Sequence, residues 1–249
     1  MIKSLSAAAA ALCLVCWTGA CKTEPDDYRP DFGHDYFPLE VGKYRVYEAD
    51  STVFDPTGDS MVIFSKTFIK EEIVGTLTDN NGDTLYIMER FERTADSLPW
   101  QVSKVFTAAI LDNKAIQTED NLRFIKIVFP ARRNATWNGH VHFDPSLIVT
   151  VAGESLEMFK GWAYRITATG ERETIGSFDF DDVLTVRESD NENFIELRRS
   201  HAKYARGIGL VYRELWILDT QCIEPCAGLP WEEKAEKGFI LTQKIIDYN

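Results

Sequence analysis

The chain has 249 residues, a formal net charge of −12, a 45% hydrophobic fraction and five cysteines. An acidic balance of this size excludes a protein that binds nucleic acid through a broad basic face, and the apolar content excludes a disordered chain. Five cysteines are too few for a scaffold built on disulfides. A globular unit long enough to bury a sizeable core is therefore expected.

The first residues have the pattern of an export signal. Lys3 is followed by an apolar run from Leu5 to Trp17, which ends in small residues. A run of this length is too short to span about 30 Å of hydrocarbon as a permanent helix. A basic start, a short apolar run and a small-residue end are typical of a cleaved secretory signal. We therefore expect residues 1–20 to be a lipoprotein signal peptide.

Cys21 stands at the expected cleavage point. The preceding residues, Thr18–Ala20, resemble the lipobox of bacterial lipoproteins, where small residues precede a cysteine that becomes thioether-linked to diacylglycerol. The resemblance implies lipidation of Cys21, acyl chains such as palmitate, and a membrane partner reached through that lipid. Lys22 stands where an inner-membrane retention signal has Asp, so an outer-membrane protein is expected, on the cell surface or the periplasmic face.

Residues 21–35 are predicted to be the lipidated cysteine and an acidic, flexible tether. The segment holds five acidic residues, Pro25, Pro30 and Gly33, a composition that resists burial. No internal repeat or boundary follows it, so residues 36–249 are predicted to form a single β-rich domain.

Apolar residues alternate with polar ones along most of that domain, which is the pattern of β-strands. Trp162, Tyr164, Ile166 and Ala168 fall on one face of a strand, for example, and Val211, Leu215 and Ile217 on one face of another. We expect a mainly β fold, an antiparallel meander of about ten strands that forms an open barrel or a sandwich. No glycine-rich nucleotide motif argues for an α/β fold.

Turn and helix signals divide these strands. Asp79–Asp83 contains Asn-Gly, a strong hairpin signal, and Asp112–Lys114 and Asp190–Asn193 are further predicted turns. Helix is expected to be minor, with one short helix over Pro230–Lys237 and a second around Glu154–Lys160.

The two cysteines left outside the signal and the lipobox are Cys222 and Cys226. In an oxidising compartment an even pair at short spacing predicts a disulfide. Metal binding by this pair is a weaker reading, because no histidine or second cysteine pair lies nearby in the sequence.

Several short phrases carry a family resemblance: Tyr36–Leu39 with Gly42–Tyr47, Trp137–Gly139, Gly176–Phe178 and Tyr204–Val211. Together they resemble a group of uncharacterised outer-membrane lipoproteins of Bacteroidetes-type bacteria. The resemblance implies a β-rich lipoprotein and no particular activity.

Candidate site residues are few. Trp137 and Trp231 lie beside loop signals and are the best candidates for exposed, ligand-binding indoles. His140 and His142 are metal candidates, because alternate residues of a strand share a face. They are weak ones, because Asn138-Gly139 and Pro145 on either side favour an exposed edge or loop. The run Asp179, Asp181 and Asp182 could supply the paired carboxylates of a hydrolase, although an acidic turn explains it as well.

These observations favour a membrane-anchored, non-catalytic module that binds a glycan, a lipid or a protein partner. No cofactor is expected, and no nucleic-acid partner. Two alternatives stay open: a hydrolase whose site is assembled from distant strands, and a purely structural envelope protein.

Overall fold

The computed structural model describes residues 30–249. The predicted signal peptide, Cys21 and most of the predicted tether lie outside the described residues. Residues Phe32–Asn249 pack as one unit. His34 and Asp35, which the sequence assigns to the tether, belong to this unit: the carbonyl of Asp35 accepts the amide of Gly207 at 2.8 Å. The packed unit therefore includes residues that the sequence assigns to the tether.

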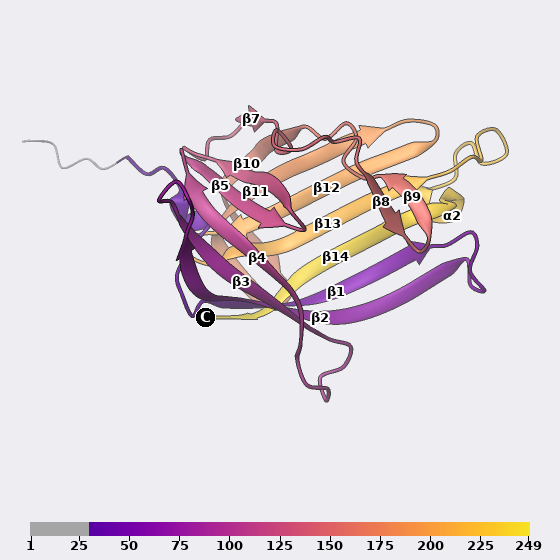
Figure 1. Ribbon diagram of the computed structural model, residues 1–249. Coiled ribbons are helices and arrows are strands. Elements are labelled where there is room, and N and C mark those ends of the chain that lie inside the picture. Colours follow the sequence, from indigo (N-terminus) through magenta and orange to yellow (C-terminus); the bar gives the residue numbers. More distant parts are fainter. Residues whose placement is uncertain (1–29) are drawn as a thin grey trace, which may run out of the picture. The chain divides into compact units, whose positions relative to one another are not determined.

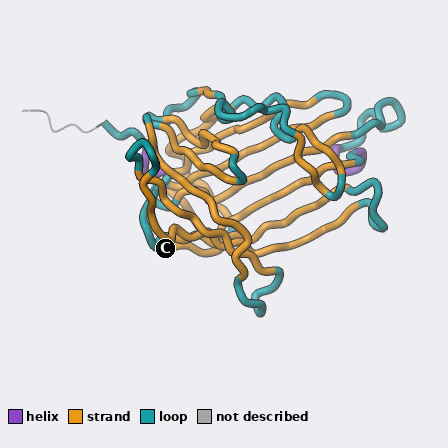
Figure 2. Tube along the Cα trace, in the orientation of Figure 1, coloured by secondary structure: helices purple, strands orange, loops and turns teal. Residues whose placement is uncertain are grey.

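The described residues form fourteen β-strands, one 3-10 helix and one short α-helix. The elements are η2 (His34–Tyr36), β1 (Tyr44–Phe54), β2 (Val62–Thr78), β3 (Thr84–Arg93), β4 (Gln101–Leu111), β5 (Lys114–Glu119), β6 (Leu122–Val128), β7 (Thr136–Trp137), β8 (Ile148–Val151), β9 (Glu154–Glu157), β10 (Tyr164–Ile175), β11 (Phe178–Glu192), β12 (Glu196–Ala205), β13 (Gly209–Asp219), α2 (Trp231–Lys234) and β14 (Lys237–Tyr248). Figure 2 shows how little of the described chain is helical.

Twelve strands form one antiparallel sheet in the order β6-β5-β4-β3-β2-β1-β14-β13-β12-β11-β10-β7, while β8 and β9 pair only with each other. The sheet has two halves, one from β6 to β1 and one from β14 to β7. Within each half, neighbouring strands mostly follow one another in the chain (Figure 1). The predicted mainly β meander is confirmed. Of the two predicted architectures, the barrel is the one found, because a single curved sheet comes close to closing on itself.

The closure lies between the two edge strands, β6 and β7. The amide of Ile125 donates to the carbonyl of Gly139 at 2.9 Å, and the indole nitrogen of Trp137 donates to the carbonyl of Ile125 at 2.8 Å. We call this contact the seam. It satisfies part of the backbone of two edges that would otherwise be open.

Two of the predicted turns lie where the sequence places them. Gly82 has a φ of 87° in the hairpin between β2 and β3, and the carboxylate of Asp79 caps that turn by accepting the amides of Asn81 and Asp83. Asp112 and Asn113 both adopt positive φ between β4 and β5, as a two-residue hairpin requires. The turn predicted at residues 190–193 lies slightly later, because β11 continues to Glu192.

The helix predictions need correction. The helix expected over Pro230–Lys237 is one turn, Trp231–Lys234. The helix expected around Glu154–Lys160 is wrong, since Glu154–Glu157 is strand β9. Ala152 and Gly153 have φ values of 50° and 81° and make a tight turn that pairs β9 with β8. The strand count of about ten was low because several strands, β7 to β9 among them, are very short.

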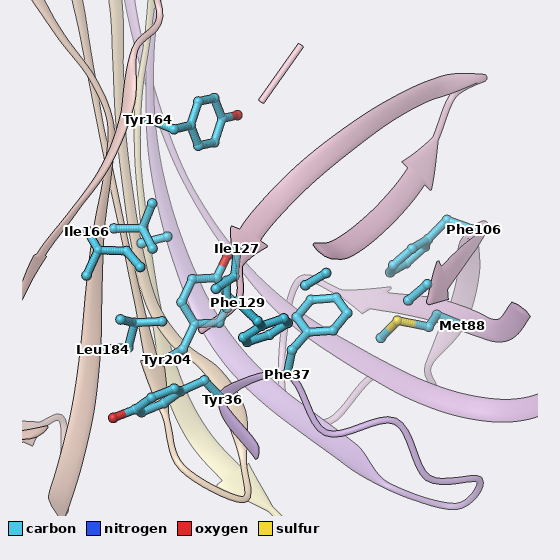
Figure 3. Packing of buried hydrophobic residues seen from close by; sticks show 14 of the residues in the cluster. Tyr36, Phe37, Met88, Phe106, Ile127, Phe129, Tyr164, Ile166, Leu184 and Tyr204 are labelled. Carbon is cyan, nitrogen blue, oxygen red and sulfur yellow. The ribbon is translucent and has the colours of Figure 1, made fainter. Parts of the chain in front are cut away.

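The main apolar core fills one end of the sheet. Phe37, just after η2, and Phe129, just after β6, are buried in it. Figure 3 shows these two rings between the strand that carries Ile166 and the strand that carries Met88. The segment around η2 therefore packs inside the sheet and joins its opposing walls.

Strand β9 covers another part of the same inner surface. Leu156 is 1% exposed and packs with Leu215 and Ile217 of β13. Arg213 lies in phase with these two residues, on the same face of β13. Within residues 30–249, no helix has the length and apolar character needed to cross a bilayer.

Candidate functional site

A buried carboxylate lies inside the sheet. Glu188 of β11 has no exposed surface. Lys126 of β6 donates to one of its oxygens at 2.6 Å, and Ser200 of β12 donates to the other at 2.6 Å. The guanidinium of Arg213 lies 3.3 Å from that second oxygen. One carboxylate thus connects β6 to three strands of the other half of the sheet.

Glu188 is held in its ionised form. Burial by itself raises the pKa of the carboxyl, but the charges of Lys126 and Arg213 and the hydrogen bonds outweigh burial and lower the pKa to about 2. At neutral pH the group has no proton to donate. Its chemistry is that of a fixed counter-ion rather than a general acid.

A second ionic network lies beside the first. Arg90 pairs with Glu71 at 2.7 Å and with Glu119 at 2.8 Å. Lys104 reaches Glu119 at 3.0 Å and Asp120 at 2.6 Å. Burial opposes ionisation of Glu119, but the neighbouring cations lower its pKa to about 2. Each of these acids already has a cation beside it.

Lys126 and Arg213 carry more donors than their partners use. Lys126 has three N–H donors and Arg213 has five. Within residues 30–249 each side chain uses one donor in a hydrogen bond, and the acceptor is Glu188 in both cases. The Nε of Arg213 is buried and has no partner in this part of the chain. That atom has almost no accessible surface, so a ligand reaches the other N–H donors of the two side chains rather than Nε. Those donors make this point of the interior suited to an acceptor.

Two hollows meet at these donors. The first, the inner cavity, has a volume of about 30 Å³, enough for roughly two water molecules. It lies toward Phe37 and Tyr204. The second, the groove, has a volume of about 480 Å³, within the size range of small-molecule sites. Gln117, Lys126 and Arg213 line both hollows.

The groove has one polar end and apolar walls. Its apolar lining consists of Leu122, Phe124, Leu147, Ile148, Val149, Met158 and Phe159. Its polar lining consists of Gln117, Glu119, Asp120, Lys126 and Arg213. Leu147 and Ile148 are exposed, whereas the donors of Lys126 adjoin the inner cavity. The groove thus runs from a mouth at Leu147 and Ile148, where the carboxylate of Asp120 is exposed as well, to a donor-rich floor.

The two candidate metal ligands are separated by the fold. His140 is 3% exposed, and its Nε2 lies 3.1 Å from the hydroxyl of Tyr164. Burial, and then the charge of Lys126, lower the pKa of His140 to about 4, so the ring is neutral at neutral pH. His142 is exposed. Among residues 30–249 there is no group of three His, Cys, Asp or Glu side chains that could hold a metal ion.

Aromatic rings enclose His140. The rings in contact with it are Phe124, Phe143, Phe159, Trp162 and Tyr164. Two of them, Phe124 and Phe159, also line the groove. His140 therefore packs against two residues of the groove wall and does not itself line the groove.

The two candidate tryptophans differ in exposure. Trp231 is 6% exposed and packs with Phe54 and Leu218, so the expected exposed indole is not found there. The loop signals around Trp231 say nothing of the distant strands that cover it. Trp137 is half-buried, and its indole nitrogen forms part of the seam. Neither tryptophan lines the groove.

The remaining candidates have structural partners. Cys222 and Cys226 form a disulfide with their Cα atoms 5.6 Å apart, while Cys21 lies outside the described residues. The three aspartates of β11 do not converge. Asp181 pairs with a surface arginine, Asp182 accepts the hydroxyl of Tyr36, and Asp179 bonds a threonine on β10.

Sequence reasoning missed the residues that line the polar floor. A signal was present for Arg213, which occupies the one inward position skipped by the apolar series Val211, Leu215 and Ile217. A charge in phase with buried residues indicates an internal partner. The sequence could not show that Lys126 and Glu188 are partners, because no local pattern links β6 to β11.

No family model and no curated protein matches the chain. Two solved structures are similar to most of it. One, provisionally described as an exported protein with a YmcC-like fold, is from Bacteroides fragilis NCTC 9343, with 9% identity, 88% of this chain and 100% of that chain covered, and a TM-score of 0.39. The other, provisionally described as a lipoprotein, is from Parabacteroides distasonis ATCC 8503, with 9% identity, 89% and 100% coverage, and a TM-score of 0.34. Scores this low assign neither a function nor a site.

Proposed function

We propose that this protein is a lipid-anchored lipoprotein of the outer membrane whose β-domain binds a small ligand in the groove and catalyses no reaction. The anchor rests on the lipobox that ends at Cys21. The binding role rests on one observation, a groove of about 480 Å³ with apolar walls that ends at Lys126 and Arg213, each of which uses one N–H donor on Glu188.

The chemistry of the groove favours binding over hydrolysis. A hydrolase that works through paired carboxyls needs one that keeps a proton near neutral pH. The acids that line or adjoin the groove are paired with cations, and the pKa values of Glu119 and Glu188 are lowered to about 2. His140, whose neighbours Phe124 and Phe159 line the groove, is enclosed by aromatic rings.

The proposal can be tested by mass spectrometry of the full chain, expressed with its own leader and extracted from membranes in styrene–maleic acid particles, which avoids detergent. Small molecules retained by the wild type are compared with those retained by Val149→Trp, which fills the groove. Val105→Trp is the matched control, because Val105 is 56% exposed on β4 and lines neither hollow.

The expected result is a small molecule that co-purifies with the wild type and with Val105→Trp and is lost from Val149→Trp. Equal small-molecule content in all three proteins would contradict a ligand in the groove. The same spectra give the mass of the intact chain, which reports whether Cys21 carries lipid.

A further inference from the structure

The ligand class follows from how polarity is distributed along the groove, and this inference rests on the proposed function. Seven of the twelve lining residues are apolar and form the walls. Leu147 and Ile148 reach the mouth, where Asp120 is exposed as well. The donors lie at the opposite, inner end. A ligand that satisfies both ends must be amphiphilic, with a long apolar part and one compact polar group.

The polar group must accept hydrogen bonds. Lys126 and Arg213 keep most of their N–H donors free of protein partners within residues 30–249. The acids that line the groove are engaged: Glu119 accepts from Arg90, Lys104 and Gln117. A group rich in donors, such as an ammonium or a sugar, therefore finds few acceptors at the floor.

A carboxylate matches this floor better than a neutral acceptor does. Glu188 contacts both cations, and the carboxylate of Glu119 also interacts with them electrostatically. A ligand carboxylate offers two acceptor oxygens, which suit the unused N–H donors of an ammonium and of a guanidinium at the same time. Hydrogen bonds from a cation to a carboxylate are also stronger than bonds between neutral groups.

The size of the groove favours one acyl chain. About 480 Å³ lies toward the lower end of the range for small-molecule sites. Phe124, Met158 and Phe159 supply aromatic and thioether surface along the walls, and Leu147 and Ile148 continue it to the mouth. Methionine adapts readily to flexible apolar ligands.

We infer that the groove binds a single-chain fatty acid, carboxylate first, with the carboxylate at Lys126 and Arg213 and the end of the chain at Leu147 and Ile148.

The test is photo-crosslinking in membrane vesicles that contain the full chain. The probe is dodecanoic acid with a diazirine at the end of the chain, and the matched probe is the alcohol of the same length with the same diazirine. Labelled peptides are identified by mass spectrometry, with unlabelled dodecanoate as competitor. The acid is expected to label Leu147–Met158 saturably, and more than the alcohol by roughly tenfold, the difference made by one charge-assisted hydrogen bond.

Two variants locate the carboxylate. Arg213→Lys keeps the positive charge beside Glu188 but removes the planar guanidinium and two of its five N–H donors, so it should reduce labelling by the acid and leave labelling by the alcohol unchanged. Arg199→Lys, on an exposed face of β12, should change neither. Equal labelling by acid and alcohol in the wild type, or no effect of Arg213→Lys, overturns the fatty-acid assignment.

The outcomes also separate this inference from the proposed function. If another small molecule is retained by the wild type and lost from Val149→Trp, while the acid probe fails to label the groove, the binding function stands and the ligand class is wrong. If neither probe labels the groove and Val149→Trp retains the same molecules as the wild type, both proposals fail.

Discussion

Lys126 of β6 and Glu188 of β11 form an ion pair of 2.6 Å inside the sheet, with side-chain exposures of 9% and 0%. The two residues come from opposite halves of the sheet, and Lys126 follows Ile125, which forms the seam. The ion pair therefore links the two halves beside the seam. A buried ion pair adds little net stability compared with apolar residues, but breaking one partner leaves an uncompensated charge. The pair therefore fixes how the two halves meet.

Glu188→Gln should destabilise the domain by about 3–5 kcal/mol, because Lys126 and Arg213 lose their shared counter-ion. The measurement is urea unfolding followed by tryptophan fluorescence at neutral pH. Glu48→Gln is the control: its partner Lys66 is 2.9 Å away at the surface, and loss of an exposed pair costs about 1 kcal/mol or less.

The double variant Glu188→Gln with Lys126→Met should recover part of that loss, since it removes one of the two unpaired cations. A double variant as unstable as the sum of the two single variants would show that the two residues are not coupled.

The pH dependence of stability should contain a contribution from His140. Its pKa is lowered to about 4 in the folded protein, against about 6.5 in the unfolded chain. The unfolded state therefore binds more protons between these two values, and stability falls as the pH falls from about 6.5 to about 4.

His140→Phe should remove this contribution. The variant is expected to be less stable than the wild type at pH 7, because the hydroxyl of Tyr164 loses a partner, and the gap in melting temperature should narrow as the pH falls to 4. His142→Phe, at an exposed position, should leave the slope nearly unchanged. A constant gap for His140→Phe across this range would refute the assignment.

Gly139→Ala tests the seam. A Cβ at Gly139 collides with the ring of Tyr164, and the carbonyl of Gly139 accepts the amide of Ile125. We expect a loss of about 1–3 kcal/mol in unfolding free energy, together with faster hydrogen exchange at the amide of Ile125. Gly75→Ala is the control, because no atom lies within 4 Å of a Cβ built there. Unchanged exchange at Ile125 in the Gly139 variant would argue against the seam.

Cys21→Ser should abolish acylation, because the thiol is the group that forms the thioether. The measurement is incorporation of labelled palmitate in cells that express the full chain. Cys16→Ser, within the predicted signal peptide, should incorporate label as the wild type does. Incorporation into the Cys21 variant would exclude this cysteine as the lipidated residue.

Much of the fold could be predicted because its signals are local. Alternating apolar residues and the turns at Gly82 and Asp112 specify successive hairpins, and successive hairpins make a meander. The short hairpin of β8 and β9 was missed, because four residues such as Glu154–Glu157 suit a helix as well as a strand until their partner is known.

The candidate site could not be predicted because its signals are not local. Arg213 is the one charged residue in the inward series from Val211 to Ile217, and its partner Glu188 lies two strands away in the sheet. The burial of Trp231 could not be predicted for the same reason. Loop signals flank it in the sequence, but Phe54 and Leu218, from other segments of the chain, bury its indole.

The strand order has a consequence for how the domain assembles. The seam joins segments close together in the chain, whereas β1 and β14, near opposite ends of the described residues, pair in the middle of the sheet. Tyr47 and Ile245 face each other in that pairing, and both are fully buried. Each half of the sheet is a run of local hairpins that closes at low entropic cost, but the β1–β14 pairing must close the longest loop. The β1–β14 pairing therefore joins the two halves of the sheet into a single cooperative unit.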